Sequence, residues 1–373
     1  MKSVTTQIIL DKLLEERLVV GAIILSIILL ITSGTALEQA GTQESDFPVQ
    51  EEFNQMMQLE LGSSAPAAFF RGLMLIFLTL AVSGIVLNIH GFAGRNLRYF
   101  QPAAPPEVRW GIWPVLKIAA YFFCLLLIFQ RLESVFFSIF GFFRTGIYYQ
   151  LIIGNAFFQF FLMIFLVICF LTKYRYSKQF SPPGAVKVLS PGSIVVDTPR
   201  EMQSSPMELL GISLEGWGAS LRQALRGYIL FFPSLIVLMV LSLLATKIIG
   251  LPYQPHQLVQ PLLEAGESSL LWPLFGLAIL IGPLAEELFF RGLFFPALKS
   301  KMSVFAAVII SAALFATLHL NWAGWLPIFG LGILLTYSYQ KTGDLLVPIF
   351  IHIIHNSLFL TFTVLLFQLR EVR

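Results

Sequence analysis

Long apolar runs recur along the chain and are separated by short polar stretches. A run of about 20 apolar residues is long enough to cross the hydrocarbon layer of a membrane as a helix. We predict such segments near residues 18–37, 68–92, 112–130, 149–172, 228–249, 272–298, 303–320, 325–340 and 345–367. The predicted fold class is all-α, a polytopic transmembrane helical bundle of about nine spans.

The composition agrees with a multi-pass integral membrane protein, whose first partner is the lipid bilayer. Of the 373 residues, 57% are hydrophobic and 12% are charged, against roughly 25% charged in a soluble domain. The net charge is only +3, and the basic residues lie near the ends of apolar runs. This pattern argues against nucleic acid as a partner. Cys124 and Cys169 both lie in apolar runs, which predicts neither a disulfide framework nor a thiolate metal site.

Basic residues mark one side of the predicted membrane. Because cytoplasmic loops are enriched in Lys and Arg, their positions indicate orientation. They precede the first segment, follow the second and fourth, and close the sixth and eighth: Lys2, Lys12, Arg17, Arg95, Arg98, Arg109, Lys173, Arg175, Lys178, Arg291, Lys299, Lys301 and Lys341. The acidic stretch 38–66 contains no Lys or Arg and is predicted to lie outside. The N-terminus is therefore predicted to be cytoplasmic, with the first segment a retained signal-anchor.

Three regions follow from this arrangement. They are an N-terminal transmembrane region of about four spans with the acidic external loop 38–66 (1–173), a cytoplasmic linker (174–226) and a C-terminal bundle (227–373). The linker ends in a predicted short interfacial helix, with apolar side chains on one face and Arg222 and Arg226 on another.

Two adjacent carboxylates lie in the sixth predicted segment. Charge placed inside a membrane is costly, and intramembrane carboxylates usually serve a function. Glu287 and Arg291 are four residues apart with the acid first, the spacing of an intrahelical ion pair. Glu286 points about 100° away and has no partner on its own helix. We predict that Glu287 and Arg291 are structural and that Glu286 is available for chemistry.

Polar residues in two further segments are candidates for the same site. Counted along each helix at about 1.5 Å per residue, Glu286, His319, His352 and Asn356 all lie at middle depths of the layer. A carboxylate beside an imidazole can activate water for attack on a carbonyl, and a neighbouring His and Asn can stabilise the resulting oxyanion. Alternatively, Glu286, His319 and His352 have the ligand types of a zinc site. The predicted cofactor is thus either none or zinc.

The motifs Glu286-Glu287-x-x-x-Arg291, Phe315-x-x-x-His319 and His352-x-x-x-Asn356 follow one another on successive apolar segments. In this order they resemble the signature motifs of the CAAX protease and bacteriocin-processing (CPBP) intramembrane endopeptidases, relatives of the type II CAAX prenyl endopeptidase. The resemblance covers about residues 210–367.

The resemblance implies a CPBP-like protease core at 227–373. Glu286 and His319 would activate water, and His352 and Asn356 would bind the oxyanion, with Glu287, Arg291 and Phe315 in support. The implied substrate is a peptide precursor, a prenylated CAAX-type protein or a membrane-embedded protein. Glutamate-dependent and metalloprotease chemistry both stay open. His355 lies outside the motifs, as either an extra pocket group or a hydrogen-bonded core histidine.

Other intramembrane protease classes fit poorly. The chain has no His-Glu-x-x-His motif, its aspartates lie outside the deep parts of the segments, and Ser220 has no histidine placed beside it. Two non-protease alternatives are a proton-coupled transporter, with Glu286, His319 and His352 as a relay, and a catalytically silent scaffold or immunity protein. A transporter would be expected to show paired internal repeats, and the sequence shows none.

Overall fold

The computed structural model of the chain describes residues 65–93, 100, 110–140, 154, 156, 158–172, 187–190, 193–195, 207, 210–212, 216–249, 271–319 and 321–371. The predicted first segment, 18–37, lies outside the described residues, as does nearly all of the acidic loop 38–66. Most of the linker 174–226 is also outside them.

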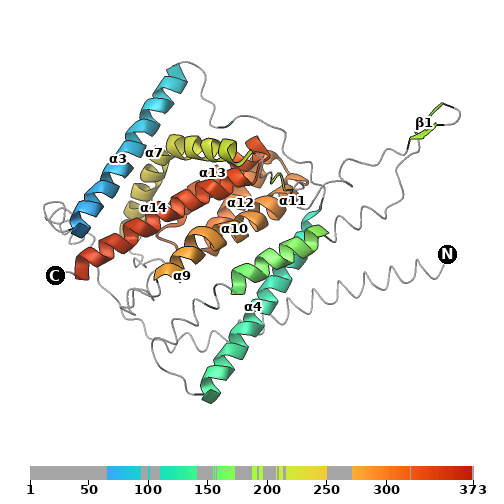
Figure 1. The fold of residues 1–373 in the computed structure, drawn as a ribbon, viewed down its shortest axis with the longest axis horizontal. Helices are drawn as coiled ribbons and strands as arrows, with labels where there is room; N and C mark the ends of the chain where they lie inside the picture. Colours follow the sequence, from blue (N-terminus) through green and yellow to red (C-terminus); the bar gives the residue numbers. More distant parts are fainter. Residues whose placement is uncertain are drawn as a thin grey trace.

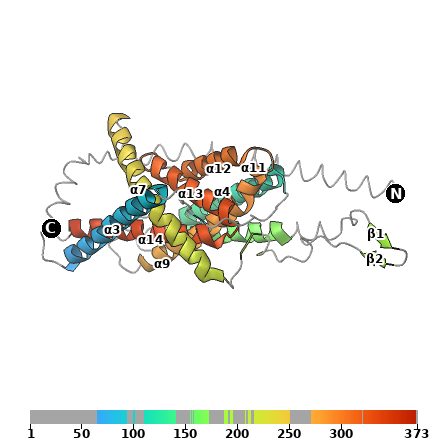
Figure 2. The ribbon, with the colours of Figure 1, turned by 90° about the horizontal axis from the view of Figure 1, so that it is seen from above.

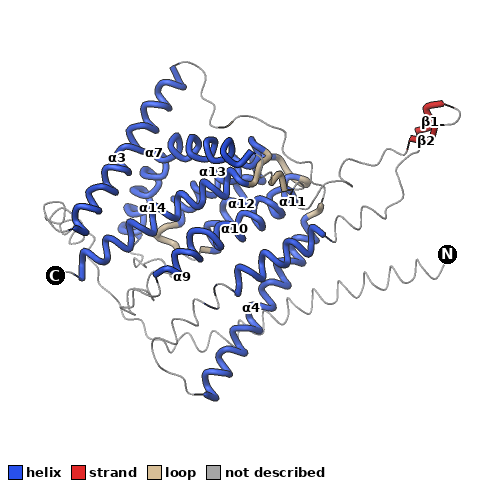
Figure 3. The backbone as a smooth tube through the Cα atoms, in the orientation of Figure 1, coloured by secondary structure: helices blue, strands red, loops and turns tan. Residues whose placement is uncertain are grey.

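Helices account for almost all of the described chain (Figure 1). The long ones are α3 (Ala65–Ala93), α4 (Ile112–Phe140), Phe158–Thr172, α7 (Trp217–Ile249), α12 (Val304–Leu318), α13 (Trp325–Thr342) and α14 (Leu346–Glu371). Strands β1 (Lys187–Ser190) and β2 (Ser193–Val195) pair antiparallel, with Lys187 opposite Val195, and lie apart from the helices (Figure 3). The predicted all-α membrane fold is confirmed, apart from this small hairpin.

Three described helices are long and apolar enough to cross a membrane: Ala68–Gly91, Trp217–Ile249 and Leu346–Leu365. Shorter apolar helices occur at Ile112–Leu125, Phe158–Thr172 and Val304–Leu318. The helices therefore support an integral membrane protein. The number of spans, about nine, stays a prediction.

Helix α7 differs from the sequence expectation. The predicted interfacial helix before residue 226 and the predicted span from 228 form one continuous helix from Trp217 to Ile249. No proline occurs in the first four turns, and the first one, Pro233, lies well inside the helix. Helix α3 packs against α7, where Asn88 Nδ2 donates to the carbonyl oxygen of Leu230 at 2.8 Å.

The sixth predicted segment is a helix with two wide turns. It consists of α9 (Leu271–Gly276), the π-helix η4 (Leu277–Ile281), α10 (Gly282–Glu287), the π-helix η5 (Leu288–Phe294) and α11 (Phe295–Lys299). Pro283 and Pro296 lie in the first turns of α10 and α11. Because proline has no N–H for the regular helical bond, the α-helical pattern restarts at each one after a wide turn. The two glutamates lie on the α-helical turn between these π segments, and π turns are frequent at functional sites.

Short connections hold α12, α13 and α14 together. The Ser303 hydroxyl caps α12 by accepting from Ala306 N. Helix α13 ends at Gly343, whose φ of 63° is a left-handed conformation that favours glycine. Asp344 Oδ1 then accepts from Leu346 N at 2.9 Å at the start of α14.

Helix α14 lies among the other helices of the described bundle (Figures 1 and 2). It packs against α3, α7, α13, η4 and α10, while α12 packs mainly on α13. Motif-bearing segments far apart in the sequence, on α10, α12 and α14, are thereby brought to one place.

Candidate active site

Glu287 is buried at the centre of the bundle. Arg291 Nη1 donates to Glu287 Oε1 at 2.7 Å, and both side chains are 0% exposed. The predicted intrahelical ion pair is therefore confirmed. Arg291 has further contacts, because Nη2 lies 3.3 Å from the carbonyl oxygen of Gly332 on α13 and the guanidinium lies 4.5 Å from the Phe315 ring centre.

The same carboxylate oxygen also holds a histidine of another helix. His352 Nδ1, on α14, lies 2.9 Å from Glu287 Oε1. An ionised carboxylate can only accept hydrogen bonds, so the proton of this bond is on Nδ1. The other ring nitrogen, Nε2, is thereby left for the opposite side of the ring.

Glu286 faces two imidazoles from two different helices. Its Oε2 lies 3.9 Å from His319 Nε2 and 3.9 Å from His352 Nε2. Oε2 is buried without a hydrogen bond, although a quarter of the whole side chain is exposed. These three side chains belong to the sixth, seventh and ninth predicted segments, which therefore come together as predicted.

His319 is oriented by its own helix. It is the C-cap residue of α12, and its Nδ1 lies 2.7 Å from the carbonyl oxygen of Phe315 one turn earlier. A carbonyl oxygen can only accept, so Nδ1 carries the proton. In a neutral ring Nε2 is then a proton acceptor, and it is the atom that faces Glu286.

The Phe315 side chain contacts members of all three motifs. Its ring centre lies 4.6 Å from that of His319 and 5.7 Å from that of His352. The Arg291 guanidinium and the edge-on Phe290 ring cover other parts of it. Phe315 is 1% exposed, so it packs the site from within.

Asn356 and His355 lie on α14 one turn or less after His352, with different partners. Asn356 Nδ2 donates to the carbonyl oxygen of Ala278, in the π segment η4, at 2.8 Å. This bond uses one of the two amide protons. His355 Nδ1 lies 3.3 Å from the Tyr228 hydroxyl on α7, and its ring packs on Phe359. His355 is thus a hydrogen-bonded histidine between α7 and α14, one of the two roles anticipated for it.

The distances from the Glu286 carboxylate to the two imidazoles are too long for a zinc site. Ligands at the usual bond length of about 2.0–2.1 Å in a tetrahedron lie roughly 3.3 Å apart, whereas Glu286 Oε2 is 3.9 Å from each imidazole nitrogen. Within the described parts of the chain, no three His, Cys, Asp or Glu side chains are grouped closely enough to hold a metal ion. Glu286, His319 and His352 in this arrangement do not fit a metal centre.

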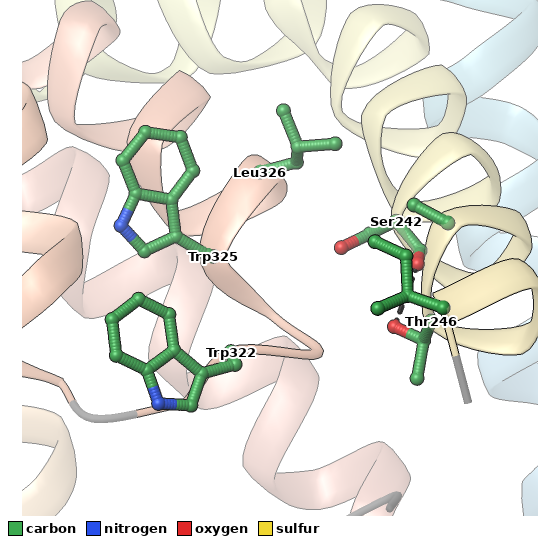
Figure 4. A pocket seen from close by; sticks show the side chains of 7 residues that line it. Ser242, Thr246, Trp322, Trp325 and Leu326 are labelled. Carbon is green, nitrogen blue, oxygen red and sulfur yellow. Dashed lines mark hydrogen bonds between the residues drawn. The ribbon is translucent and has the colours of Figure 1, made fainter. Parts of the chain in front are cut away.

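A separate pocket lies between α7 and the start of α13 (Figure 4). It has a volume of about 500 Å³ and is lined by Ser242, Ala245, Thr246, Ile249, Trp322, Trp325 and Leu326. None of the motif residues lines it. Trp325 nevertheless links it to the last turn of α12, because its Nε1 donates to Thr317 Oγ1 at 3.1 Å.

A known protein family matches the part of the chain that carries the three motifs. Residues 268–358 match the family model described as type II CAAX prenyl endopeptidase Rce1-like. This range contains all three motifs, so the recognition made from them is confirmed for this part of the chain. The matching part is similar to membrane peptidases of the CAAX type.

Two curated bacterial proteins are similar to the chain. The putative membrane peptidase YdiL of Bacillus subtilis is 35% identical over 94 residues, which are 25% of this chain and 36% of that protein. The membrane-embedded CAAX protease MroQ of Staphylococcus aureus is 37% identical over 93 residues, 23% of this chain and 37% of that protein. The matches thus span little more than a third of these relatives. No solved structure matches the chain.

Sequence reasoning missed two contacts of the site. The bond from His352 to Glu287 joins residues 65 positions apart, and no spacing rule predicts such a pair. Tyr228, the partner of His355, was anticipated only as the first residue of a span. The available signal was a tyrosine at the start of one apolar segment together with a histidine inside another apolar segment.

Proposed function

We propose that this protein is an intramembrane endopeptidase that hydrolyses peptide bonds with Glu286 as its general base. The observation that carries the proposal is the position of Glu286 Oε2, buried, without a hydrogen bond and equally distant from two imidazole nitrogens of other helices. A buried carboxylate with no hydrogen-bond partner is costly. One that is retained in a membrane protein usually serves a function.

In the proposed reaction a water molecule lies between Glu286 and His319. The water donates one hydrogen bond to the Glu286 carboxylate and another to His319 Nε2. The Phe315 carbonyl, by accepting from Nδ1, keeps Nε2 in acceptor form. As the water oxygen attacks the carbonyl carbon, Glu286 takes the proton. The carbon–nitrogen bond then breaks, and Glu286 returns this proton to the leaving amine.

The oxyanion formed by this attack requires donors. Asn356 has a second amide proton beyond the one given to Ala278. His352 donates from Nε2 when this nitrogen is protonated. The proposed division is therefore Glu286 and His319 for water activation, and His352 and Asn356 for the oxyanion.

The proposed substrate is a peptide precursor, a prenylated CAAX-type protein or a membrane-embedded protein segment. The similarity to a putative membrane peptidase and to a CAAX protease supports this class. The apolar helices that carry the site support a substrate that reaches it from the bilayer.

The test is cleavage of a fluorogenic peptide library by detergent-purified protein. Glu286→Gln and His319→Ala are each expected to lower kcat by roughly 100-fold or more, because each removes a group that handles the water proton. Thr79→Val, on the surface of α3, is the matched control and is expected to cleave as wild type does.

The same assay with a chelator separates the two chemistries. Activity that is unaffected by chelation supports glutamate-dependent hydrolysis. Activity that is lost and then restored by zinc would reassign Glu286, His319 and His352 to a metal. Unchanged cleavage by both variants would reject the site, and a folded but inactive wild type would favour the scaffold alternative.

A further inference from the structure

Glu287 Oε1 accepts hydrogen bonds from two helices at once. Arg291 Nη1 lies 2.7 Å away on the same helix, and His352 Nδ1 lies 2.9 Å away on α14. The Glu287 side chain is 0% exposed and that of His352 is 3% exposed, so neither bond competes with solvent. The carboxylate therefore fixes both the ring orientation of His352 and the nitrogen that carries its proton.

We propose that Glu287 is the positioning residue for His352, and not only the ion-pair partner of Arg291. By holding Nδ1–H, it directs Nε2 toward Glu286 Oε2, 3.9 Å away. It also supplies the negative charge next to the ring when Nε2 carries a second proton and donates to the oxyanion. This inference rests on the proposed function, since it explains how His352 becomes an oxyanion donor.

The two imidazoles beside Glu286 differ in their second partner, which supports this role. His319 Nδ1 is bonded to a neutral backbone carbonyl, that of Phe315. His352 Nδ1 is bonded to a carboxylate. Neutral and charged partners suit different tasks, because a carboxylate stabilises an imidazolium and a carbonyl holds a neutral ring in one tautomer. His319 is thereby suited to accept from water and His352 to donate.

No proton transfer to Glu287 is needed. The proton on His352 Nε2 stays there while it stabilises the oxyanion. Only the water proton moves, from water to Glu286 and on to the leaving amine. Glu287 keeps its bonds to Arg291 and His352 throughout.

The alternative is that Glu287 serves only to neutralise Arg291. Arg291 has contacts of its own, to the Gly332 carbonyl and over the Phe315 ring, but it is fully buried. Glu287→Gln alone would leave this buried cation without a counter-charge, which strongly destabilises a protein. The informative variant is the double substitution Glu287→Gln with Arg291→Met, which removes both charges and keeps an unbranched side chain at each position.

The double variant is expected to fold with near wild-type thermal stability in detergent, since removing both members of a buried pair is often neutral. Its kcat is expected to fall on the order of 100-fold or more with KM little changed, because losing an orienting carboxylate costs this much in other enzymes. Asn88→Leu, which breaks the α3–α7 bond far from the motifs, controls for general destabilisation. A double variant with wild-type kcat would overturn the proposal.

A second readout does not depend on cleavage. In protein labelled with ¹⁵N-histidine, the His352 ring signals, assigned by their loss in His352→Gln, report which nitrogen is protonated. Wild type is expected to show a protonated, hydrogen-bonded Nδ1, and the double variant is expected to lose this hydrogen-bonded Nδ1 signal. Identical ring spectra would contradict the role of Glu287. Absence of cleavage by wild type would instead contradict the proposed function, so the two failures are distinguishable.

Discussion

The Phe315 side chain contacts residues of all three motifs. Its ring contacts Arg291 of the first motif, His319 of its own motif and His352 of the third. Its carbonyl oxygen also accepts from His319 Nδ1. An aromatic ring at this position holds a guanidinium by cation–π attraction, worth about 0.5–2 kcal/mol, and keeps both imidazoles at fixed positions.

Phe315→Leu is therefore expected to affect both catalysis and stability. Leucine cannot cover the Arg291 guanidinium or pack flat on the imidazoles, so kcat should fall roughly tenfold or more as the site loosens. Stability should fall by about 1–2 kcal/mol. The measurements are steady-state cleavage and thermal unfolding in detergent.

The matched control is Phe70→Leu on α3. Phe70 is similarly buried, at 2% exposed, and stacks on Phe362 with ring centres 5.9 Å apart. It should lose similar stability and keep its kcat. An equal loss of kcat in both variants would show that Phe315 acts only through general packing.

Among the elements, the close approach of α12 and α13 places His319. A Cβ on Gly332 would lie 3.1 Å from both the Cα and the Cβ of Ala312. The carbonyl of Gly332 also faces Arg291 Nη2. Glycine at this position lets α13 contact α12 and Arg291 together.

Gly332→Ala is expected to push α12 away from α13. Overpacking of this kind costs about 1–3 kcal/mol, and the shift moves Phe315 and His319 relative to Glu286, so kcat should fall as well. Gly72→Ala in α3 is the control, because a Cβ there meets nothing within 4 Å. Unaltered cleavage and unfolding in Gly332→Ala would show that the two helices adjust freely.

Helices, motifs and one ion pair were predictable from the chain, and the remaining contacts were not. Apolar runs mark helices because a buried membrane segment must satisfy its own backbone. The Glu287–Arg291 pair follows from local helix geometry. The π segments around Glu286, the bond from His352 to Glu287 and the continuity of α7 depend on packing between distant residues. Residue spacing carries no information on such packing, so these features required the structure.

For the molecule as a whole, helix lengths lead us to expect the site inside the bilayer. Helix α12 has 15 residues, so it extends only about 22 Å, less than the roughly 30 Å of the hydrocarbon layer. We expect its capped start to lie near one interface, which would leave His319, at the far end, within the layer. Helix α7, with 33 residues, extends about 50 Å, which is longer than the hydrocarbon layer is thick.

The orientation predicted from basic residues can be tested with cysteine substitutions. Lys247, near the end of α7, and Lys301, after α11, are both exposed, and the described helix between them runs from Leu271 to Lys299. The distribution of Lys and Arg places Lys301 on the cytoplasmic side, so Lys247 should lie outside. The background is Cys124→Ser with Cys169→Ser, which removes both native thiols.

In intact cells a membrane-impermeant maleimide is expected to label Lys247→Cys and to label Lys301→Cys only after permeabilisation. Activity of each variant serves as the control for correct folding. Labelling of both from outside would mean that the helix bearing Glu286 does not cross the membrane. The reverse pattern would invert the topology, with the N-terminus outside, while leaving the depth of His319 unchanged. The expected pattern would place Glu286 on a membrane-crossing helix that enters from the outer side, and a substrate would then meet the carboxylate inside the bilayer.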